Sequence, residues 1–372
     1  MKVVHIIKAT RISGAERHLL ILLPALRMRG VEVHLILLED PAHPVDEMAA
    51  ELTEADVPVW RIPIYRHSDV RVIGRIRHVL RTLRPDIVHT HLIHADLYGM
   101  AAARLARVGT VISSRHNDDN FRRLLPVRIF HRLLWWMTNS GIAISQAIAR
   151  FCIEVEGAPA RKITTIYYGL PLKVVDRKTA RSALRDELGL APDTLLIGMV
   201  CRLIEQKGVV YGLRAFARIA PQFPTAQFVI AGDGLLRGKL EAEAQTLGVQ
   251  DRVHFLGWRS DTPSIMAALD LLLMPSLWEG FGLVLLEAMA QTVPIIGSGV
   301  SAIPEVVLEG ETGRLVPPRD IGALAAALTE LLTDEAGRRH MGLMGQDRVE
   351  TVFSVEQMVE QTLALYGRFT SL

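Results

Sequence analysis

The sequence predicts an α/β protein made of two doubly wound parallel sheets in series. Three observations support this fold class. Short apolar, β-branched runs alternate with helical patterns along the whole chain, which is typical of parallel sheets covered by helices on both faces. The 372 residues exceed what one compact core usually holds. A charged stretch with little strand character, residues 176–193, separates two similar sets of strands.

The predicted elements follow in order on either side of that stretch. In the first half, buried strands are expected at residues 3–7, 32–38, 86–91, 110–114 and 140–145. In the second half they are expected at residues 195–200, 227–232, 252–257, 271–276 and 293–298. The first domain should span residues 1–172 and the second residues 173–372, with the last helix free to pack back on the first domain. Two such domains would leave a cleft between them, lined by loops at the carboxyl ends of strands.

Composition narrows the class of protein. With 49% hydrophobic and 22% charged residues, the chain has the balance of a globular protein. Its two cysteines, Cys152 and Cys201, exclude a disulfide scaffold. The N-terminus reads as a buried strand and not as a signal peptide, and no run of about 18 apolar residues would span a bilayer. These features predict a cytoplasmic protein.

Charge is unevenly distributed along the chain. Residues 1–170 contain 23 Lys and Arg against 16 Asp and Glu, whereas the remainder contains 19 against 24. A basic first half indicates an anionic partner, either a phosphate-bearing substrate or a membrane surface. Nucleic acid is not expected, because no RNA-binding, zinc-finger or basic-zipper pattern accompanies the charge.

The loop after the strand at 195–200 carries two cations. Arg202 and Lys207 lie five residues apart, beside Gly208. Together they suit a diphosphate, the arginine as a fork and the lysine as a point charge, although each alone is more often a solvated surface charge. The loop is not a Walker motif, because no Ser or Thr follows the lysine. Further on, the glycines of "AGDGLLRG" miss the dinucleotide fingerprint by one residue, so a tight turn is the better interpretation.

The segment "PSLWEGFGLVLLEAMA", residues 275–290, places two carboxylates around a predicted helix start. Glu279 lies in the loop after the strand at 271–276, and Glu287 lies more than a turn along the following helix. Between them, the backbone N–H groups of Phe281, Gly282 and Leu283 form a predicted phosphate cradle. The two carboxylates then suit hydroxyl pairs at opposite ends of one long ligand, as in a nucleotide sugar.

These segments resemble a known family. "CRLIEQKG", "AGDGLLRGKLE", "HFLGW" and "PSLWEGFGLVLLEAMA" look, in order and spacing, like the C-terminal signature of the retaining glycosyltransferases of family 4. "SGAERHL", "DIVHTHLIHA", "SSRHN" and "TIYYGLP" resemble landmarks of the family's acceptor domain. The resemblance covers nearly the whole chain and implies the GT-B fold, in which two Rossmann-like domains face across a cleft.

The resemblance also implies roles for residues of the second domain. Arg202 and Lys207 would bind the donor diphosphate. Glu279 would hold the transferred sugar, and Glu287 would hold the ribose hydroxyls. No metal or other cofactor is expected, because the two cations already neutralise the diphosphate.

In the first domain, Gly14 would approach the donor phosphate through its backbone, and His116 would lie by the sugar near the reacting carbon. His116, Lys207 and Glu279 would then be the catalytic residues. Two positions depart from the family pattern. Ser13 stands where many members have a glycine, and Tyr168 stands where an asparagine is usual, so the role of that asparagine does not carry over.

The implied activity is retaining transfer of a hexose or N-acetylhexosamine from a nucleoside diphosphate sugar. A UDP-sugar is the first expectation and GDP-mannose the second. The acceptor is expected to be a glycan or a lipid-linked glycan in the synthesis of cell-surface polysaccharide.

Three further functions stay open on the sequence. His89 and His91 share one face of a predicted strand, a spacing that suits zinc in a metal-dependent hydrolase. The nearest carboxylate, Asp96, is alone, so a satisfied structural pair is the more common interpretation. The second function is that of a sugar-nucleotide epimerase of similar fold, and the third is that of a homologue that only binds nucleotide. The two cations together with the paired glutamates favour transfer over the epimerase, and the presence of Lys207, Glu279 and His116 argues against a homologue that only binds nucleotide.

The stretch from Phe121 to Met137 predicts an amphipathic helix that lies on anionic membrane. Phe130, Leu133, Leu134 and Met137 follow helical spacing, and Arg128, His131 and Arg132 cover the other side. Arg122 and Arg123 add to this basic character, which is typical of interfacial helices. A core helix packed on the first sheet is weighted equally.

Overall fold

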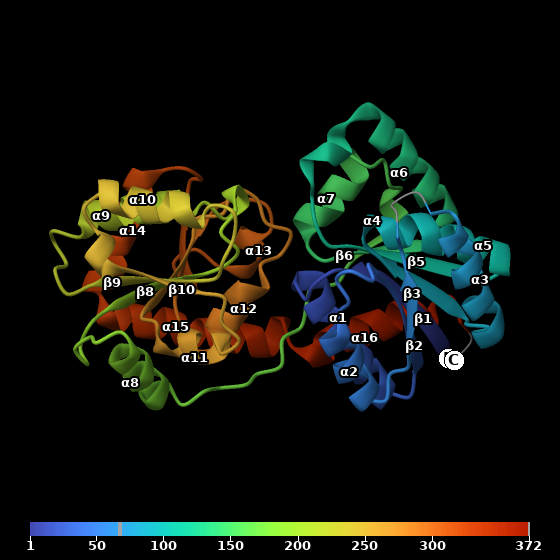
Figure 1. Ribbon diagram of the computed structural model, residues 1–372, viewed down its shortest axis with the longest axis horizontal. Helices are drawn as coiled ribbons and strands as arrows, with labels where there is room; N and C mark the ends of the chain where they lie inside the picture. The colour runs from blue at the N-terminus through green and yellow to red at the C-terminus, as the bar shows by residue number, and fades with distance from the viewer. Residues whose placement is uncertain (66–68, 371–372) are drawn as a thin grey trace. The chain divides into compact units, whose positions relative to one another are not determined.

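The chain forms two compact α/β units, which the computed structural model describes over residues 1–65 and 69–370 (Figure 1). Unit 1 comprises Met1–Pro171 together with Phe353–Leu372, and unit 2 comprises Leu172–Val352. The chain therefore leaves unit 1 after Pro171 and returns to it at Phe353.

Unit 1 is built on a seven-stranded parallel sheet with the order β3-β2-β1-β4-β5-β6-β7. The strands are β1 (Lys2–Ala9), β2 (Glu32–Glu39), β3 (Val59–Pro63), β4 (Ile87–His91), β5 (Thr110–Arg115), β6 (Ser140–Ala143) and β7 (Ile163–Thr165). Strand order reverses between β1 and β4, so the loops that follow these two strands diverge. Such a switch point is where ligands bind in doubly wound folds.

Helices cover both faces of this sheet (Figure 1). One face packs on α1 (Gly14–Met28), α2 (Asp46–Glu54) and α16 (Val355–Gly367). The other packs on α3 (Arg71–Leu83), α5 (Ala101–Ala106) and α6 (Leu125–Met137). Shorter or more peripheral elements complete the unit: α4 (Leu92–Ala95), η1 (Asp96–Met100), η2 (Asn120–Arg123), α7 (Gln146–Glu154) and η3 (Ala160–Lys162).

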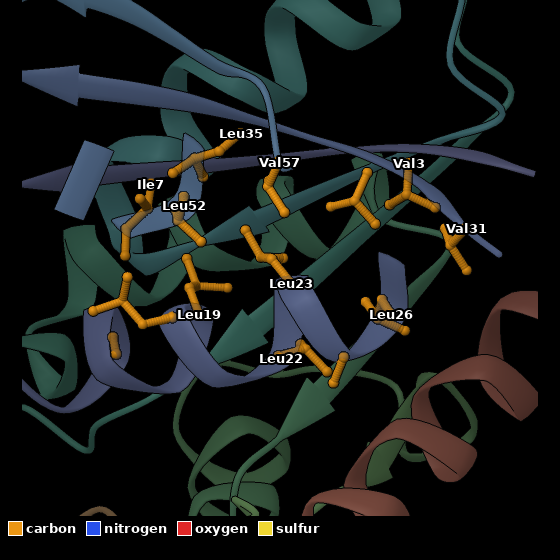
Figure 2. Close-up of a cluster of buried hydrophobic side chains, with 14 of the residues drawn as sticks. Val3, Ile7, Leu19, Leu22, Leu23, Leu26, Val31, Leu35, Leu52 and Val57 are labelled. Carbon is orange, nitrogen blue, oxygen red and sulfur yellow. The ribbon is translucent and has the colours of Figure 1, made fainter. Parts of the chain in front are cut away.

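The core beneath α1 shows why that helix forms. Leu19, Leu23 and Leu26 recur at helical spacing and lie against the strands (Figure 2). Val3 and Ile7 alternate along β1 and point to the same side. Because β-strand side chains alternate between faces, His5 between them also points to the α1 and α16 face.

Unit 2 is built on a six-stranded parallel sheet with the order β10-β9-β8-β11-β12-β13. Its strands are β8 (Leu196–Val200), β9 (Gln227–Ala231), β10 (Val253–Gly257), β11 (Leu271–Met274), β12 (Ile295–Ser298) and β13 (Gly313–Val316). One core joins α9 (Val209–Ile219), α10 (Arg237–Thr246) and α14 (Ile321–Thr333) to the sheet. The remaining elements are α8 (Arg177–Glu187), η4 (Glu205–Lys207), η5 (Gln250–Arg252), α11 (Thr262–Ala268), α12 (Leu283–Ala290), α13 (Ile303–Val306) and α15 (Glu335–Val352).

The predicted fold class of two doubly wound parallel sheets is confirmed, and each predicted strand is present. Three strands were not predicted: β3, β7 and β13. Each lies at an edge of its sheet, where side chains are only partly covered and the apolar signal is weak. The charged stretch at 176–193 contains helix α8, which belongs to unit 2.

Candidate functional site

The loops that follow β8 and β11 are joined by hydrogen bonds. These strands are neighbours at the point where strand order reverses in unit 2. The side-chain amide of Gln206 donates to the carbonyl of Trp278 (3.0 Å), and the N–H of Leu277 donates to the carbonyl of Gln206 (2.8 Å). Gly208 has φ +61°, and a Cβ there would lie 2.1 Å from the carbonyl oxygen of Pro275. Only glycine therefore allows the two loops to approach so closely.

An ion pair crosses between these loops. The ammonium of Lys207 lies 2.5 Å from a carboxylate oxygen of Glu279, and the side chains are only 14% and 11% exposed. Burial raises the pKa of the adjacent Cys201 thiol to about 11, and the charges of Lys207, Glu279 and Arg202 all act on the same thiol. Three of the four predicted donor-binding charges thus lie near the carboxyl end of β8. Arg202 itself is exposed.

Helix α12 starts where the sequence predicted. Gly282 precedes it in the left-handed region, with φ +88°, and the helix begins at Leu283. Phe281 is buried, and Glu287 lies half-buried in the second turn. The helix start between the two glutamates is thus confirmed, and phosphate binding there stays a prediction.

Sequence reasoning missed Ser276, which lies beside Lys207 in the wall of a small cavity at the ends of β8 and β11. Its hydroxyl is buried and has no hydrogen-bond partner among the described residues. A buried hydroxyl without a partner costs about 1–3 kcal/mol. The available signal was a polar residue directly at the end of an apolar strand.

In unit 1, Ser13 and Gly14 form the start of α1, after β1. The N–H and hydroxyl of Ser13 both donate to the carboxylate of Glu16, at 3.1 and 2.7 Å. Gly14 is exposed, and a Cβ added there would meet nothing within 4 Å. Neither φ nor local packing therefore requires glycine at this position, and its proposed approach to phosphate stays a prediction.

His116 follows β5 and is buried between two partners. Its Nε2 lies 3.1 Å from Nδ1 of His91, and its Nδ1 lies 2.5 Å from the hydroxyl of Tyr168. The structure thus brings the predicted catalytic histidine together with the residue that replaces the usual asparagine. Burial, reinforced by the charges of neighbouring basic groups, lowers the pKa of His116 well below 6.5, so the ring is neutral at physiological pH.

His89 and His91 do share one face of β4, together with His5 of β1. Ring nitrogens of the three lie within 4.8 Å of one another, close enough to hold a metal. However, both nitrogens of each ring already have hydrogen-bond partners in the described structure. Asp96 lies on the opposite face, where it accepts from Thr90 at 2.6 Å. The donor set therefore fits a satisfied polar cluster better than a zinc site.

A buried ionic cluster lies on the other side of β5. Arg115 pairs with Asp96 and Glu156, and Arg122 donates to Glu156 at 2.8 Å. Burial alone would raise the pKa of Glu156, but the two guanidinium groups outweigh it and lower that pKa to about 2. The prediction that Arg122 faces a membrane is therefore wrong, because its side chain is 2% exposed and paired with Glu156.

Helix α6 presents a different face to solvent from the one predicted. Its exposed apolar residues recur at positions i, i+4, i+8 and i+11: Leu125, Ile129, Leu133 and Trp136. Leu134, expected in the same stripe as Leu133, is instead buried, and so is His131, expected on the polar side. Phe130 and Met137 pack against the core. The alternative of a core helix is thus confirmed for Phe130, Leu134 and Met137, whereas the predicted faces are wrong for Leu133 and His131.

Two Rossmann-like units in one chain, the second with charged loops at its switch point, have the architecture of the GT-B glycosyltransferases. The model for Glycosyltransferase Family 4 matches residues 12–174, and the model for Glycosyl transferases group 1 matches residues 180–348. The chain belongs to glycosyltransferase family 4.

Similar proteins act on sugars in several settings. The chain is 29% identical to the UDP-Gal:alpha-D-GlcNAc-diphosphoundecaprenol alpha-1,3-galactosyltransferase of Escherichia coli, with 80% of this chain and 79% of that protein covered. It is 28% identical to the N-acetyl-alpha-D-glucosaminyl L-malate synthase of Bacillus anthracis, with 85% and 82% covered. Its fold is similar to that of HepE of Anabaena in complex with UDP, at a TM-score of 0.85 and 23% identity, over 99% of this chain and 100% of that one.

Proposed function

We propose that this glycosyltransferase moves a hexose or N-acetylhexosamine from a nucleoside diphosphate sugar to a glycan or lipid-linked acceptor, with retention of the anomeric configuration. The observation that carries the proposal is the Lys207–Glu279 pair, which joins two loops at the carboxyl ends of β8 and β11. A UDP-sugar is the first candidate donor and GDP-mannose the second. The setting is the synthesis of cell-surface polysaccharide, which the E. coli relative, named for a diphosphoundecaprenol acceptor, supports.

Each charged group of the site has a proposed task. Arg202, Lys207 and the start of α12 stabilise the charge that develops on the leaving diphosphate, where preorganised donors have most effect. Glu279 accepts hydrogen bonds from the transferred sugar, and Glu287 accepts them from the ribose hydroxyls. When donor binds, its phosphate competes with Glu279 for Lys207. That exchange turns the pair of the free enzyme into two separate ligand contacts.

The reaction breaks the bond between the anomeric carbon and the donor phosphate oxygen and forms a bond from that carbon to the acceptor oxygen on the same face. The acceptor proton passes to the donor phosphate as the bond breaks. Gly14 lies against the donor phosphate through its backbone, and His116 lies beside the sugar. No carboxylate has to act as a nucleophile in this scheme, unlike in the double displacement of retaining glycosidases.

Assaying a panel of sugar donors is the decisive experiment. Purified enzyme is incubated with UDP-, GDP- and ADP-sugars and candidate acceptors, and released nucleotide and glycosylated product are measured. We expect one UDP-sugar to give both. Conversion of the donor sugar without any transfer would identify an epimerase, and binding without turnover would identify a nucleotide-binding homologue.

Lys207→Ala tests whether the Lys207 cation stabilises the leaving diphosphate. Loss of the cation should lower kcat/KM by about 10²–10³-fold, the size of one preorganised contact to developing charge. Lys239→Ala, which removes an exposed lysine of α10 in the same unit, is the matched control. The double variant Lys207→Met with Glu279→Gln leaves no unpaired buried charge, so its inactivity would not reflect misfolding. Near-normal kcat/KM in Lys207→Ala would refute the assignment.

We also propose that turnover needs no metal, because Lys207 and Arg202 supply the charge that a divalent cation supplies elsewhere. Activity should survive EDTA at full rate. Loss of activity in EDTA that Mg²⁺ or Mn²⁺ restores would contradict this.

A third part of the proposal concerns membrane attachment. No helix in the described part of the chain is long and apolar enough to cross a bilayer. The exposed stripe of α6, with Trp136 80% exposed, is flanked by exposed Arg123 and Arg132. Apolar residues beside arginine are what an interfacial helix presents to anionic lipid. We propose that α6 rests on the inner face of the cell membrane, near a lipid-linked acceptor.

Liposome sedimentation tests this attachment. The enzyme should co-sediment with anionic vesicles, and less so in high salt or when Ile129, Leu133 and Trp136 are changed to Ser. A matched control changes Leu235 and Trp258 of unit 2, which are also exposed apolar residues, to Ser. Equal sedimentation with neutral and anionic vesicles, or with neither, would refute the attachment.

A further inference from the structure

A continuous line of hydrogen bonds runs through the buried interior of unit 1, on the face of the sheet covered by α1 and α16. We call it the histidine–tyrosine chain. It draws residues from β1, β4, β5, the loops after β5 and β7, and helix α16. Its members, in order, are Ser114, His89, Tyr366, His5, His91, His116 and Tyr168.

Each link has hydrogen-bonding distance. From the Ser114 end, the atom-to-atom separations are 2.8, 2.6, 3.3, 2.9, 3.1 and 2.5 Å. The middle of the chain is sealed, since His5, His91 and Tyr366 have no exposed surface. His116, at 8%, is its most exposed member. The histidine–tyrosine chain therefore comes nearest to solvent at His116, where the proposed function places the sugar.

The four histidine rings are oriented the same way along the histidine–tyrosine chain. In His89, His5, His91 and His116 alike, Nδ1 faces toward Tyr168 and Nε2 faces toward Ser114. Burial keeps all four rings neutral, since it lowers the pKa of each. A neutral imidazole has one N–H and one bare nitrogen, so it donates on one side and accepts on the other.

Two arrangements alone fill every link and also place the Tyr366 proton in a hydrogen bond. Either all four rings carry the proton on Nδ1, or all four carry it on Nε2. Reversing one ring would place two protons in one link, leave a link with none, or leave the Tyr366 O–H without an acceptor. Each such fault leaves buried polar atoms unsatisfied, which disfavours mixed arrangements. The tautomer of His116 is therefore coupled to the direction in which the Tyr366 hydroxyl donates. Tyr366 lies in α16, the last helix of the protein.

We propose that the histidine–tyrosine chain positions the reactive end of the site: it ties the tautomer of His116 to that of the other three rings, and this tautomer decides whether the Tyr168 hydroxyl donates to the His116 ring or accepts from it. A substrate hydroxyl then meets a group whose hydrogen-bonding sense is set in advance. His5, His89, His91 and Tyr366 are positioning residues in this scheme and do not touch substrate. The proposal rests on the proposed placement of His116 beside the sugar.

Tyr366→Phe is the test, because it removes one hydroxyl and keeps the ring that packs on α1. The readout is the tautomer of each ring, measured from ¹⁵N shifts and ring couplings in protein labelled at histidine. In the wild type we expect all four rings to share one tautomer. In Tyr366→Phe, His89 should become independent of the other three, and His116 should populate both tautomers. We expect kcat to fall about tenfold, which corresponds to one neutral hydrogen bond, with donor KM unchanged.

Two further variants separate positioning from packing. Tyr98→Phe removes a hydroxyl from another buried tyrosine of unit 1 that lies outside the chain, and should change neither tautomers nor kcat. Ser114→Ala removes only the terminal partner, so the four rings should still share a tautomer.

Mixed tautomers in the wild type, or an unchanged tautomer of His116 in Tyr366→Phe, would refute the coupling of the four rings through the histidine–tyrosine chain. A changed tautomer with unchanged kcat would overturn its role in positioning. An enzyme that transfers no sugar would instead overturn the proposed function, because the tautomers are measured without substrate.

Discussion

Mild acid should destabilise unit 1 long before unit 2. Six buried histidines of unit 1 have pKa values below that of an unfolded histidine: His5, His18, His89, His91, His116 and His131. Burial lowers the pKa of His5 and His18 to about 3 and that of His131 to about 4. Unfolding exposes these rings, and each then takes up a proton near pH 6.5.

The sign and size follow from proton linkage. Between pH 6.5 and about 4 the unfolded chain binds more protons than the folded one, so stability is present above this window and is lost as pH falls through it. From pH 7 to pH 6 each such histidine should cost about 0.7 kcal/mol, and six together about 4 kcal/mol. Glu156, with a pKa lowered to about 2, contributes almost nothing above pH 6. A loss of this size is a large fraction of the 5–15 kcal/mol that stabilises a typical domain.

Hydrogen exchange resolves the two units in one experiment. Amides of β1 and β4 should lose protection between pH 7 and pH 6, after correction for the intrinsic exchange rate, whereas those of β8 and β11 should lose little. Unit 2 contains two histidines, His254 and His340, so its expected loss is at most about 1.4 kcal/mol. His18→Gln should reduce the pH dependence of unit 1 by about one sixth. Equal pH dependence in both units would refute the reasoning.

Glu156→Gln should lower the stability of unit 1 to urea by about 3–5 kcal/mol, because it leaves the buried guanidinium of Arg122 without its buried carboxylate and Arg115 with Asp96 alone; an unchanged midpoint would show that the cluster tolerates the loss of this carboxylate. Gly208→Ala should abolish UDP binding in calorimetry, since its Cβ would strike the Pro275 carbonyl. Gly248→Ala, where φ is +68° and nothing lies within 4 Å, should keep UDP affinity at a cost of roughly 1 kcal/mol of stability. Glu287→Ala should raise donor KM with little change in kcat, because ribose contacts change little during the reaction; a lowered kcat at saturating donor would assign it another role.

The sequence predicted best where one local pattern decides the structure. Apolar strands between helices indicated both sheets, and the glycine before Leu283 indicated the start of α12 between Glu279 and Glu287. The pairing of Lys207 with Glu279 was not predicted as a contact, although both residues were assigned to one site. Their loops meet only because β8 and β11 are neighbours in the sheet.

Contacts between distant segments could not be read from spacing. Tyr366 lies 361 residues from His5, and Glu156 lies 34 residues from Arg122. Nothing in either local sequence names its partner. Helix α6 shows a second limit: with apolar residues on two sides, periodicity alone does not decide which stripe faces the core, and the burial of His131 and Trp135 against the sheet decides it.

The return of the chain to unit 1 at Phe353 affects the order in which the protein is completed during synthesis. Unit 1 is discontinuous: α16 packs its Met358, Val359 and Leu365 into the same core as α1. The ribosome must first make residues 172–352, which form all of unit 2. At 5–20 residues per second this takes roughly 10–40 s. Throughout that interval the groove that α16 will fill, and the His5 ring that Tyr366 will meet, remain uncovered on a nascent sheet. Unit 2, which is continuous, can fold completely before its older neighbour does.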